Sequence, residues 1–203
     1  EIGTVFHRVE GQQLPDEPSR LAILINGARE SAYWGGTSGA RVDFYDMKGI
    51  IEGLMHGLHV GTVRYQAANH PSLHPGRSAE VLVNGQKVGA FGELHPLVAR
   101  AFELEGAGVL VADIDLDALL SHVELMYRVR ALPVTPAVLE DIALVVSESV
   151  NAADVEAVIR QAGGDLLKSV TLFDVYRGEQ IGAGNKSLAY SLVYQTDERT
   201  LTD

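Results

Sequence analysis

The segment Asp141-Ile-Ala-Leu-Val-Val146 is a short apolar run that predicts a strand, and the elements after it decide the fold of the C-terminal part. The sequence next predicts a helix from Asn151 or Ala152 to Ala162. That helix should end at Gly163-Gly164, because glycine favours the position directly after a helix. Two further strands are predicted over Leu166–Tyr176 and Ser187–Gln195. The predicted order is therefore strand, helix, strand, strand.

A helix-start signal follows the third strand, because Thr202 or Asp203 would make a good N-cap. A β-α-β-β order with such a signal matches the first part of a β-α-β-β-α-β, ferredoxin-like unit. In that fold the helices cover one face of the sheet and leave the other face open. We therefore expect a ferredoxin-like unit that lacks its last helix and strand.

Side chains alternate along a strand, so each predicted strand presents two sets of residues. With the bulkier sets taken as core, the covered face comprises Ile142, Leu144, Val146, Phe173, Val175, Leu188, Tyr190, Leu192 and Tyr194. The open face then carries Ala143, Asp174, Tyr176 and Ser187, with Leu172 on the same side. One aromatic ring among small and polar side chains suits the stacking of an unpaired base. A solvated sheet face without a ligand is the alternative, and alternation alone favours it.

The N-terminal part has a mixed pattern of helices and strands. Apolar residues at steps of three and four predict an amphipathic helix over Asp43–Leu58, with Asp46 in its first turn. Asn84-Gly85 predicts a hairpin between strands over 79–83 and 86–91, because both turn residues need a positive φ. The remaining predicted elements are strands over 21–25 and 109–114 and helices over 96–104 and 117–125. Prolines at 133 and 136 place a domain boundary within 126–136.

Composition and charge exclude several classes of protein. The chain has 203 residues, 46% hydrophobic and 21% charged, which is typical of a globular protein and argues against intrinsic disorder. It contains no cysteine, so disulfide scaffolds, thiolate zinc sites and thiol nucleophiles are excluded. It has no apolar run long enough to span a membrane and no signal peptide, which predicts a cytoplasmic location and no membrane partner. The formal net charge of −11 disfavours broad gripping of phosphates, but it leaves recognition of bases open.

Several motifs resemble the β chain of bacterial phenylalanyl-tRNA synthetases, in the right order and over nearly the whole chain. The C-terminal motifs are Asp141-Ile-Ala-Leu-Val-Val146, Leu172-Phe-Asp-Val-Tyr-Arg-Gly178, Lys186-Ser-Leu-Ala-Tyr190 and Glu198-Arg-Thr-Leu-Thr-Asp203. The N-terminal motifs are Ile2-Gly3-x-Val5-Phe6, Asp43-Phe44-Tyr45-Asp46-x-Lys48-Gly49, His74-Pro-Gly-Arg-Ser-Ala79 and Phe91-Gly-Glu-Leu-His-Pro96. The resemblance implies an α+β fold: a class II synthetase-like antiparallel sheet with helices, followed by a truncated ferredoxin-like anticodon-binding domain.

The same resemblance implies a subunit of phenylalanine-tRNA ligase, which joins phenylalanine to tRNA-Phe at the expense of ATP. In the family two α and two β chains assemble, the α chain carries the catalysis, and the β chain packs on it and helps to bind tRNA. Family anticodon contacts fall on positions that match Ala143, Asp174, Tyr176 and Ser187. ATP and Mg²⁺ would belong to the complete enzyme. For this chain alone the resemblance implies no cofactor, no metal ligand, no catalytic residue and no activity.

The expected domains are 1–127, the second half of the noncatalytic synthetase-like domain, and 133–203, the anticodon-binding domain without its last helix and strand. The absence of an initiator Met fits an excised piece. Without the second helix, we expect the apolar surface around Leu188, Leu192 and Tyr194 to be uncovered and to promote self-association.

Other motifs carry weaker signals. Phe6-His-Arg-Val-Glu10 resembles a class II ATP-binding signature, but a strand and turn with exposed charges is the favoured interpretation. The pairs His56/His59 and His70/His74 have spacings that metal sites use. His70 to Gly76 is predicted to form a rigid loop, in which His70, His74 and Arg77 have no assigned role. Trp34 and Phe44 belong either to the core or to an interface with the α chain.

The residues alone leave open two other functions besides that of a tRNA ligase subunit. Ferredoxin-like β-α-β-β units also serve as regulatory modules that bind amino acids, usually at interface loops. A metal hydrolase that uses the histidines is the third class.

Overall fold

The computed structural model describes residues 1–31, 33–36, 39–104, 108–124, 126 and 132–201. The chain divides into two compact units, Glu1–Arg128 and Val129–Asp203, which we call unit 1 and unit 2. Each unit has its own hydrophobic cluster and its own sheet.

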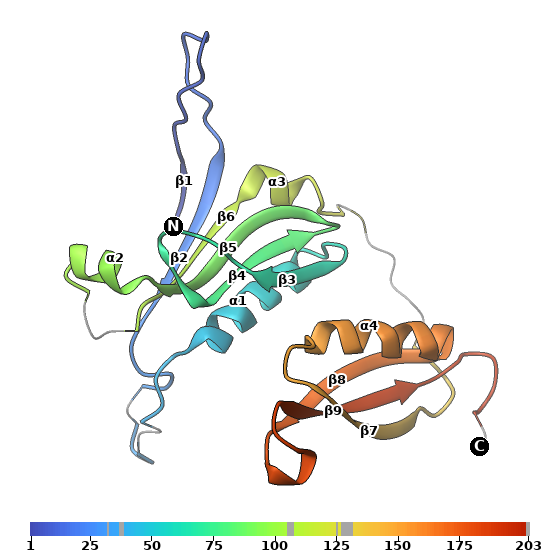
Figure 1. Ribbon diagram of the computed structural model, residues 1–203. Coiled ribbons are helices and arrows are strands. Elements are labelled where there is room, and N and C mark those ends of the chain that lie inside the picture. Colours follow the sequence, from blue (N-terminus) through green and yellow to red (C-terminus); the bar gives the residue numbers. More distant parts are fainter. Residues whose placement is uncertain (32, 37–38, 105–107, 125, 127–131, 202–203) are drawn as a thin grey trace. The chain divides into compact units, whose positions relative to one another are not determined.

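Unit 1 is built on a six-stranded antiparallel sheet in the order β1-β2-β6-β5-β4-β3. Its strands are β1 (Ile2–Thr4), β2 (Ser19–Ile25), β3 (Val63–Ala67), β4 (Leu73–Val83), β5 (Gln86–Leu94) and β6 (Leu110–Asp115). Its helices are α1 (Phe44–Gly57), α2 (Pro96–Ala101) and α3 (Leu116–Leu120). Figure 1 shows α1 lying against the sheet.

Local sequence signals explain the best-defined elements of unit 1. Asp43 caps α1 by accepting hydrogen bonds from the backbone amides of Tyr45 and Asp46, and the Asp43 amide donates to the Asp46 carboxylate. The helix buries Met47, Ile51 and Met55 against the sheet. Asn84 and Gly85 have φ values of 50° and 85°, as the predicted hairpin between β4 and β5 requires. The predicted helix and hairpin are therefore confirmed.

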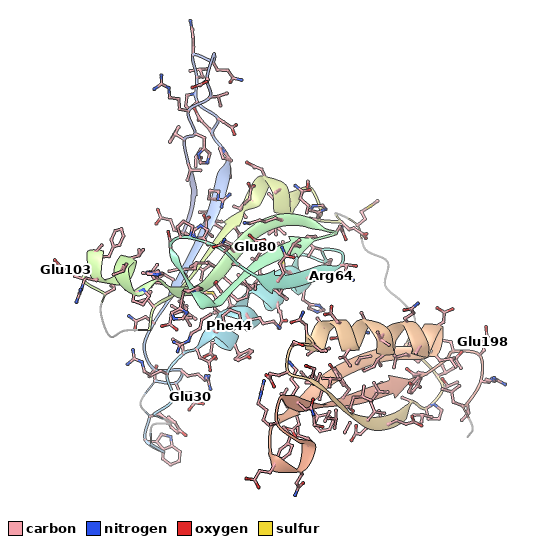
Figure 2. The ribbon with its side chains drawn as sticks, in the orientation of Figure 1. Glu30, Phe44, Arg64, Glu80, Glu103 and Glu198 are labelled. Carbon is pink, nitrogen blue, oxygen red and sulfur yellow. The ribbon has the colours of Figure 1, made fainter. Side chains whose placement is uncertain are left out.

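The two aromatic residues left open by the sequence separate clearly. Phe44 packs against the core, with its ring stacked at 5.1 Å from that of Phe91, and it lies at the start of α1 in Figure 2. Trp34 is fully exposed at 101%, so of the two alternatives the core is excluded for this residue. A single large side chain in a glycine-rich loop gives no periodic signal that could have told the two apart.

Other boundaries in unit 1 differ from the prediction. The helices α2 and α3 end earlier than 104 and 125, and residue 125 lies outside the described residues. The segment 70–76 is only partly a loop, because β4 begins at Leu73 and pairs with Leu94. A register shift between Leu73 and Ser78 accommodates Pro75, which cannot donate a ladder hydrogen bond.

The segment 5–18 joins β1 to β2 as a narrow two-stranded arm, drawn in blue in Figure 1. The backbone amide of Val5 donates to Pro18 O at 3.0 Å, and His7 and Asp16 exchange bonds of 2.8 Å. Phe6, in the predicted ATP-like signature, is 66% exposed on this arm. This agrees with the favoured interpretation of a strand and turn.

Unit 2 contains a three-stranded antiparallel sheet in the order β7-β9-β8. Its elements are β7 (Val138–Ser147), α4 (Ala152–Gly163), the short 3₁₀ turn η1 (Gly164–Leu166), β8 (Leu167–Tyr176), the 3₁₀ turn η2 (Glu179–Ile181) and β9 (Asn185–Tyr194). The helix α4 lies across one face of the sheet (Figure 1). This arrangement confirms the predicted β-α-β-β order and the α+β class.

The core of unit 2 lies between α4 and the sheet. It comprises Ile159, Leu167, Val170, Leu188, Tyr190 and Leu192, with Ile142, Val146, Ala152, Val155 and Tyr194 partly buried around them. The hydroxyl of Tyr190 donates to Ala152 O at 2.8 Å and ties the start of α4 to the sheet. Leu188 and Leu192 are buried, so the expectation that they form an uncovered patch is wrong.

The faces of three residues in unit 2, or their burial, differ from the prediction. Leu144 lies opposite Leu188 on the helix side of the sheet, but it is 37% exposed, because α4 packs mainly over β8 rather than over the edge strand β7. Leu172 lies opposite Tyr190 on the helix side, whereas Phe173 is 58% exposed, which reverses the predicted placement of both. A register shift between Leu172 and Asp174 is the cause, because an extra residue interrupts strict alternation.

Candidate nucleic-acid interface

Residues that lie directly opposite one another in antiparallel strands share a face of the sheet. Ala143 of β7 lies opposite Ala189 of β9, which lies opposite Asp174 of β8. The pairing therefore places all three on one face, in one row across the three strands.

The next row contains Val145 of β7, Ser187 of β9 and Tyr176 of β8. The predicted site residues Ala143, Asp174, Tyr176 and Ser187 thus occupy two adjacent rows of one face. This is the face away from the core, since the alternate residues Leu188 and Tyr190 are buried on the other side. We call these two rows the open-face rows.

The open-face rows are accessible. Tyr176 is 43% exposed, Ala143 and Asp174 are exposed, and Ser187 is half-buried between its neighbours. The alanines at 143 and 189 leave space beside Asp174. The face therefore offers the ring of Tyr176, one carboxylate and one hydroxyl beside small side chains, and the exposed ring of Phe173 precedes Asp174 in β8.

Val145 is a further residue of the open-face rows and is not among the predicted site residues. Val145 is 57% exposed and stands in the row of Ser187 and Tyr176. The cross-strand pairing with Ser187 is the signal that adds Val145 to the site, and the sequence of one strand alone does not show this pairing.

The charged residues at the end of these rows are paired with one another. Arg177 donates to Glu148 through Nε at 3.1 Å and through Nη2 at 2.7 Å. Hydrogen bonds from Arg177 lower the pKa of the Glu148 carboxyl below its ordinary value. Lys186 Nζ donates to the backbone oxygen of Glu148 at 2.9 Å. The site therefore supplies polar contacts and a stacking surface rather than a cationic patch.

The histidines and Arg77 have local partners. His70 and His74 accept hydrogen bonds at Nδ1 from the amides of Ser72 and Gly76, as short-range turn contacts. Arg77 contacts Glu93 of the neighbouring strand β5 at 2.6 Å. Within the described ranges, no three His, Asp or Glu residues are grouped so as to hold a metal ion. The helices in the described part of the chain are too short or too polar to cross a membrane.

Unit 2 has a helix on one face of an antiparallel sheet and an exposed aromatic-polar face on the other, which is the architecture of a ferredoxin-type recognition domain. Comparison with known proteins assigns both parts of the chain. Residues 1–116 match the family model described as "Phenylalanyl tRNA synthetase beta chain CLM domain". Residues 133–203 match the model "Ferredoxin-fold anticodon binding domain". The chain belongs to the family of phenylalanyl-tRNA synthetase β chains.

Curated relatives agree with this assignment along the whole chain. The phenylalanine–tRNA ligase β subunits of Symbiobacterium thermophilum and Shouchella clausii are each 44% identical to it over 203 and 206 residues, and that of Bacillus subtilis is 40% identical over 204. Each alignment covers 100% of this chain but only 22% to 25% of the relative. The chain therefore spans about a quarter of the length of the curated relatives it matches.

Proposed function

We propose that this chain is part of the tRNA-binding and scaffold subunit of a phenylalanine–tRNA ligase, and that unit 2 recognises the anticodon of tRNA-Phe through the open-face rows. The observation that carries the proposal is the placement of Ala143, Asp174, Tyr176 and Ser187 in two adjacent rows of one exposed face. The family-model match over residues 133–203 supports the same role.

Each open-face side chain suits one part of an unpaired base. The exposed ring of Tyr176 offers a surface on which a base can stack, and stacking of this kind tolerates every base. The carboxylate of Asp174 accepts hydrogen bonds from base N–H groups, and the Ser187 hydroxyl both donates and accepts. Ala143 and Ala189 have no bulk to hold the base away from Asp174. Stacking thus gives affinity, and the two polar groups give discrimination between bases.

In the proposal, unit 1 acts as a scaffold. Arg20 is bound by Asp113 and Asp115, and Arg29 by Asp43 and Asp46, so these guanidiniums are already engaged within the unit. We propose that unit 1 packs on the α chain, which carries the reaction of ATP, phenylalanine and tRNA to Phe-tRNA, AMP and diphosphate. The α₂β₂ assembly, the use of ATP and Mg²⁺ by the complete enzyme and a cytoplasmic location are parts of the same proposal.

The test is Tyr176→Ala in the full-length β subunit, produced together with its α chain. Loss of one stacked base is worth about 1–3 kcal/mol, which corresponds to a rise of about 5- to 150-fold in the Kd for tRNA-Phe. Activation of phenylalanine by ATP, which does not need the anticodon, should stay at the parent rate.

Leu139→Ala is the matched control. Leu139 is 72% exposed and lies on the same face and strand as Ala143, but two rows further from Tyr176. It should bind tRNA as the parent does. Because stacking is not ionic, the ratio of Tyr176→Ala to parent Kd should be the same at low and high salt. Parent-like tRNA affinity in Tyr176→Ala would remove the open-face rows from the function.

A further inference from the structure

The ring of Tyr176 rests on the backbone of Gly178. A Cβ atom added at position 178 would overlap the Tyr176 hydroxyl and Cζ, and it would lie 2.9 Å from Cε1. Real Cβ atoms essentially never come within 3.0 Å of another side chain. The ring occupies this position only because residue 178 has no side chain.

The need for glycine at position 178 comes from the ring and not from the backbone. Gly178 has φ −170° and ψ 171°, which is extended backbone that any residue adopts. The three atoms that an added Cβ would meet all belong to the far end of the Tyr176 side chain. Alanine at this position would therefore displace the ring and leave the chain path unchanged.

Hydrogen bonds before and after Gly178 fix the backbone beneath the Tyr176 ring. The neighbouring residue Arg177 is fixed to Glu148 at the end of β7 by hydrogen bonds of 2.7 and 3.1 Å. The carbonyl of Gly178 accepts a bond from the Ile181 amide at 3.3 Å, and the Glu148 amide donates to Gly184 O at 2.8 Å. Hydrogen bonds thus fix the backbone at position 178, which we call the Gly178 shelf, at the edge of the open-face rows.

We propose that Gly178 is a positioning residue for RNA recognition: its bare backbone sets the orientation in which the Tyr176 ring is presented to a base. The inference rests on the proposed function, because the ring matters only if a base stacks on it. A ring already held in one orientation loses less freedom when the base binds, and this pre-organisation adds to affinity. Gly178 itself does not touch the base.

The experiment compares Gly178→Ala, Tyr176→Ala and the double variant. In the 203-residue chain with labelled tyrosines, Gly178→Ala should shift the NMR signals of the Tyr176 ring while those of the other tyrosines stay in place. In the full-length subunit with its α chain, Gly178→Ala should weaken binding of tRNA-Phe by at least about 3-fold, and by no more than Tyr176→Ala does. The double variant should bind as Tyr176→Ala alone, since both changes act through one ring.

The outcomes separate this inference from the function on which it rests. If Tyr176→Ala binds tRNA normally, the proposed function is wrong. If Tyr176→Ala weakens binding but Gly178→Ala does not, or if the double variant is weaker than both, the role of Gly178 is wrong.

Thermal stability provides a further check. The melting temperature of Gly178→Ala should equal that of the parent. Should it fall, Tyr176→Ala must restore it by removing the overlapping ring, and failure of that rescue would also overturn the inference.

Discussion

Two tyrosine hydroxyls in this protein are shielded from solvent in different ways, and their removal should have opposite consequences. The hydroxyl of Tyr190 donates to Ala152 O at 2.8 Å. The hydroxyl of Tyr65 has no hydrogen-bond partner among the described residues, although its oxygen is buried. Burial raises the pKa of both phenols above the ordinary value, so both are neutral at physiological pH.

The expected changes in the free energy of unfolding follow from these two environments. Tyr190→Phe loses one hydrogen bond, which should lower the free energy of unfolding by about 0.5–1.5 kcal/mol. For a unit of this size, each 1 kcal/mol corresponds to a fall of about 4–8 °C in Tm. Tyr65→Phe removes a buried hydroxyl that gains nothing, while its ring keeps the edge contact with Phe91 at 5.9 Å. Its free energy of unfolding should therefore stay the same or rise.

Hydrogen-exchange mass spectrometry across a urea series is the suitable assay, because peptides from unit 1 and unit 2 report separately. The Tyr190→Phe change should appear in peptides of α4 and β9, and Tyr65→Phe should leave the peptides of β3 and β5 as protected as in the parent. Equal losses in the two variants, or a larger loss in Tyr65→Phe, would refute the reasoning from hydrogen-bond partners.

Three further predictions concern two glycines and one carboxyl group. Gly53 lies mid-helix on the exposed side of α1 with nothing within 4 Å of an added Cβ, so Gly53→Ala should stabilise unit 1 by about 0.5–1 kcal/mol. At Gly92 (φ +159°) an added Cβ would lie 2.6 Å from Ser78 Cα, so Gly92→Ala should destabilise by about 1–3 kcal/mol; urea unfolding checks both. Hydrogen bonds from Arg177 lower the pKa of Glu148, so their pairing is complete above the ordinary carboxyl pKa and is lost as pH falls through the lowered value. An NMR titration of the Glu148 carboxyl carbon should therefore show a midpoint below 4.5, the ordinary value for this carboxyl, and Arg177→Gln should raise it; an unchanged midpoint would contradict the pairing.

Features encoded within a few neighbouring residues were predictable from the sequence. Asp43 and Asp46 form both halves of a capping box, and Asn84-Gly85 determines the hairpin by its backbone preference alone. The β-α-β-β order of unit 2 follows from periodicity and glycine punctuation in the same way. These signals need no knowledge of the rest of the fold.

Features that depend on a partner strand or on distant packing were not predictable. The placement of Leu172 and Phe173 failed because the register shift in β8 appears only when β9 is laid beside it. The exposure of Leu144 depends on where α4 crosses the sheet, and that of Trp34 on a loop without periodicity. The Gly178 shelf exists because the Tyr176 side chain folds back over the residues that follow β8, and no rule of residue spacing predicts that contact.

The register shift in β8 also makes the open face depend on chain length as well as on residue identity. With an uninterrupted ladder after Leu172, position 173 would stand opposite Ala189, and Asp174 and Tyr176 would turn toward the helix. One surplus residue in the strand therefore moves every later side chain of β8 to the opposite face of the sheet. Deleting Phe173 would remove the surplus residue itself, so Asp174 would follow Leu172 directly and stay opposite Ala189. Both contact residues that β8 supplies would then keep the open face without a register shift.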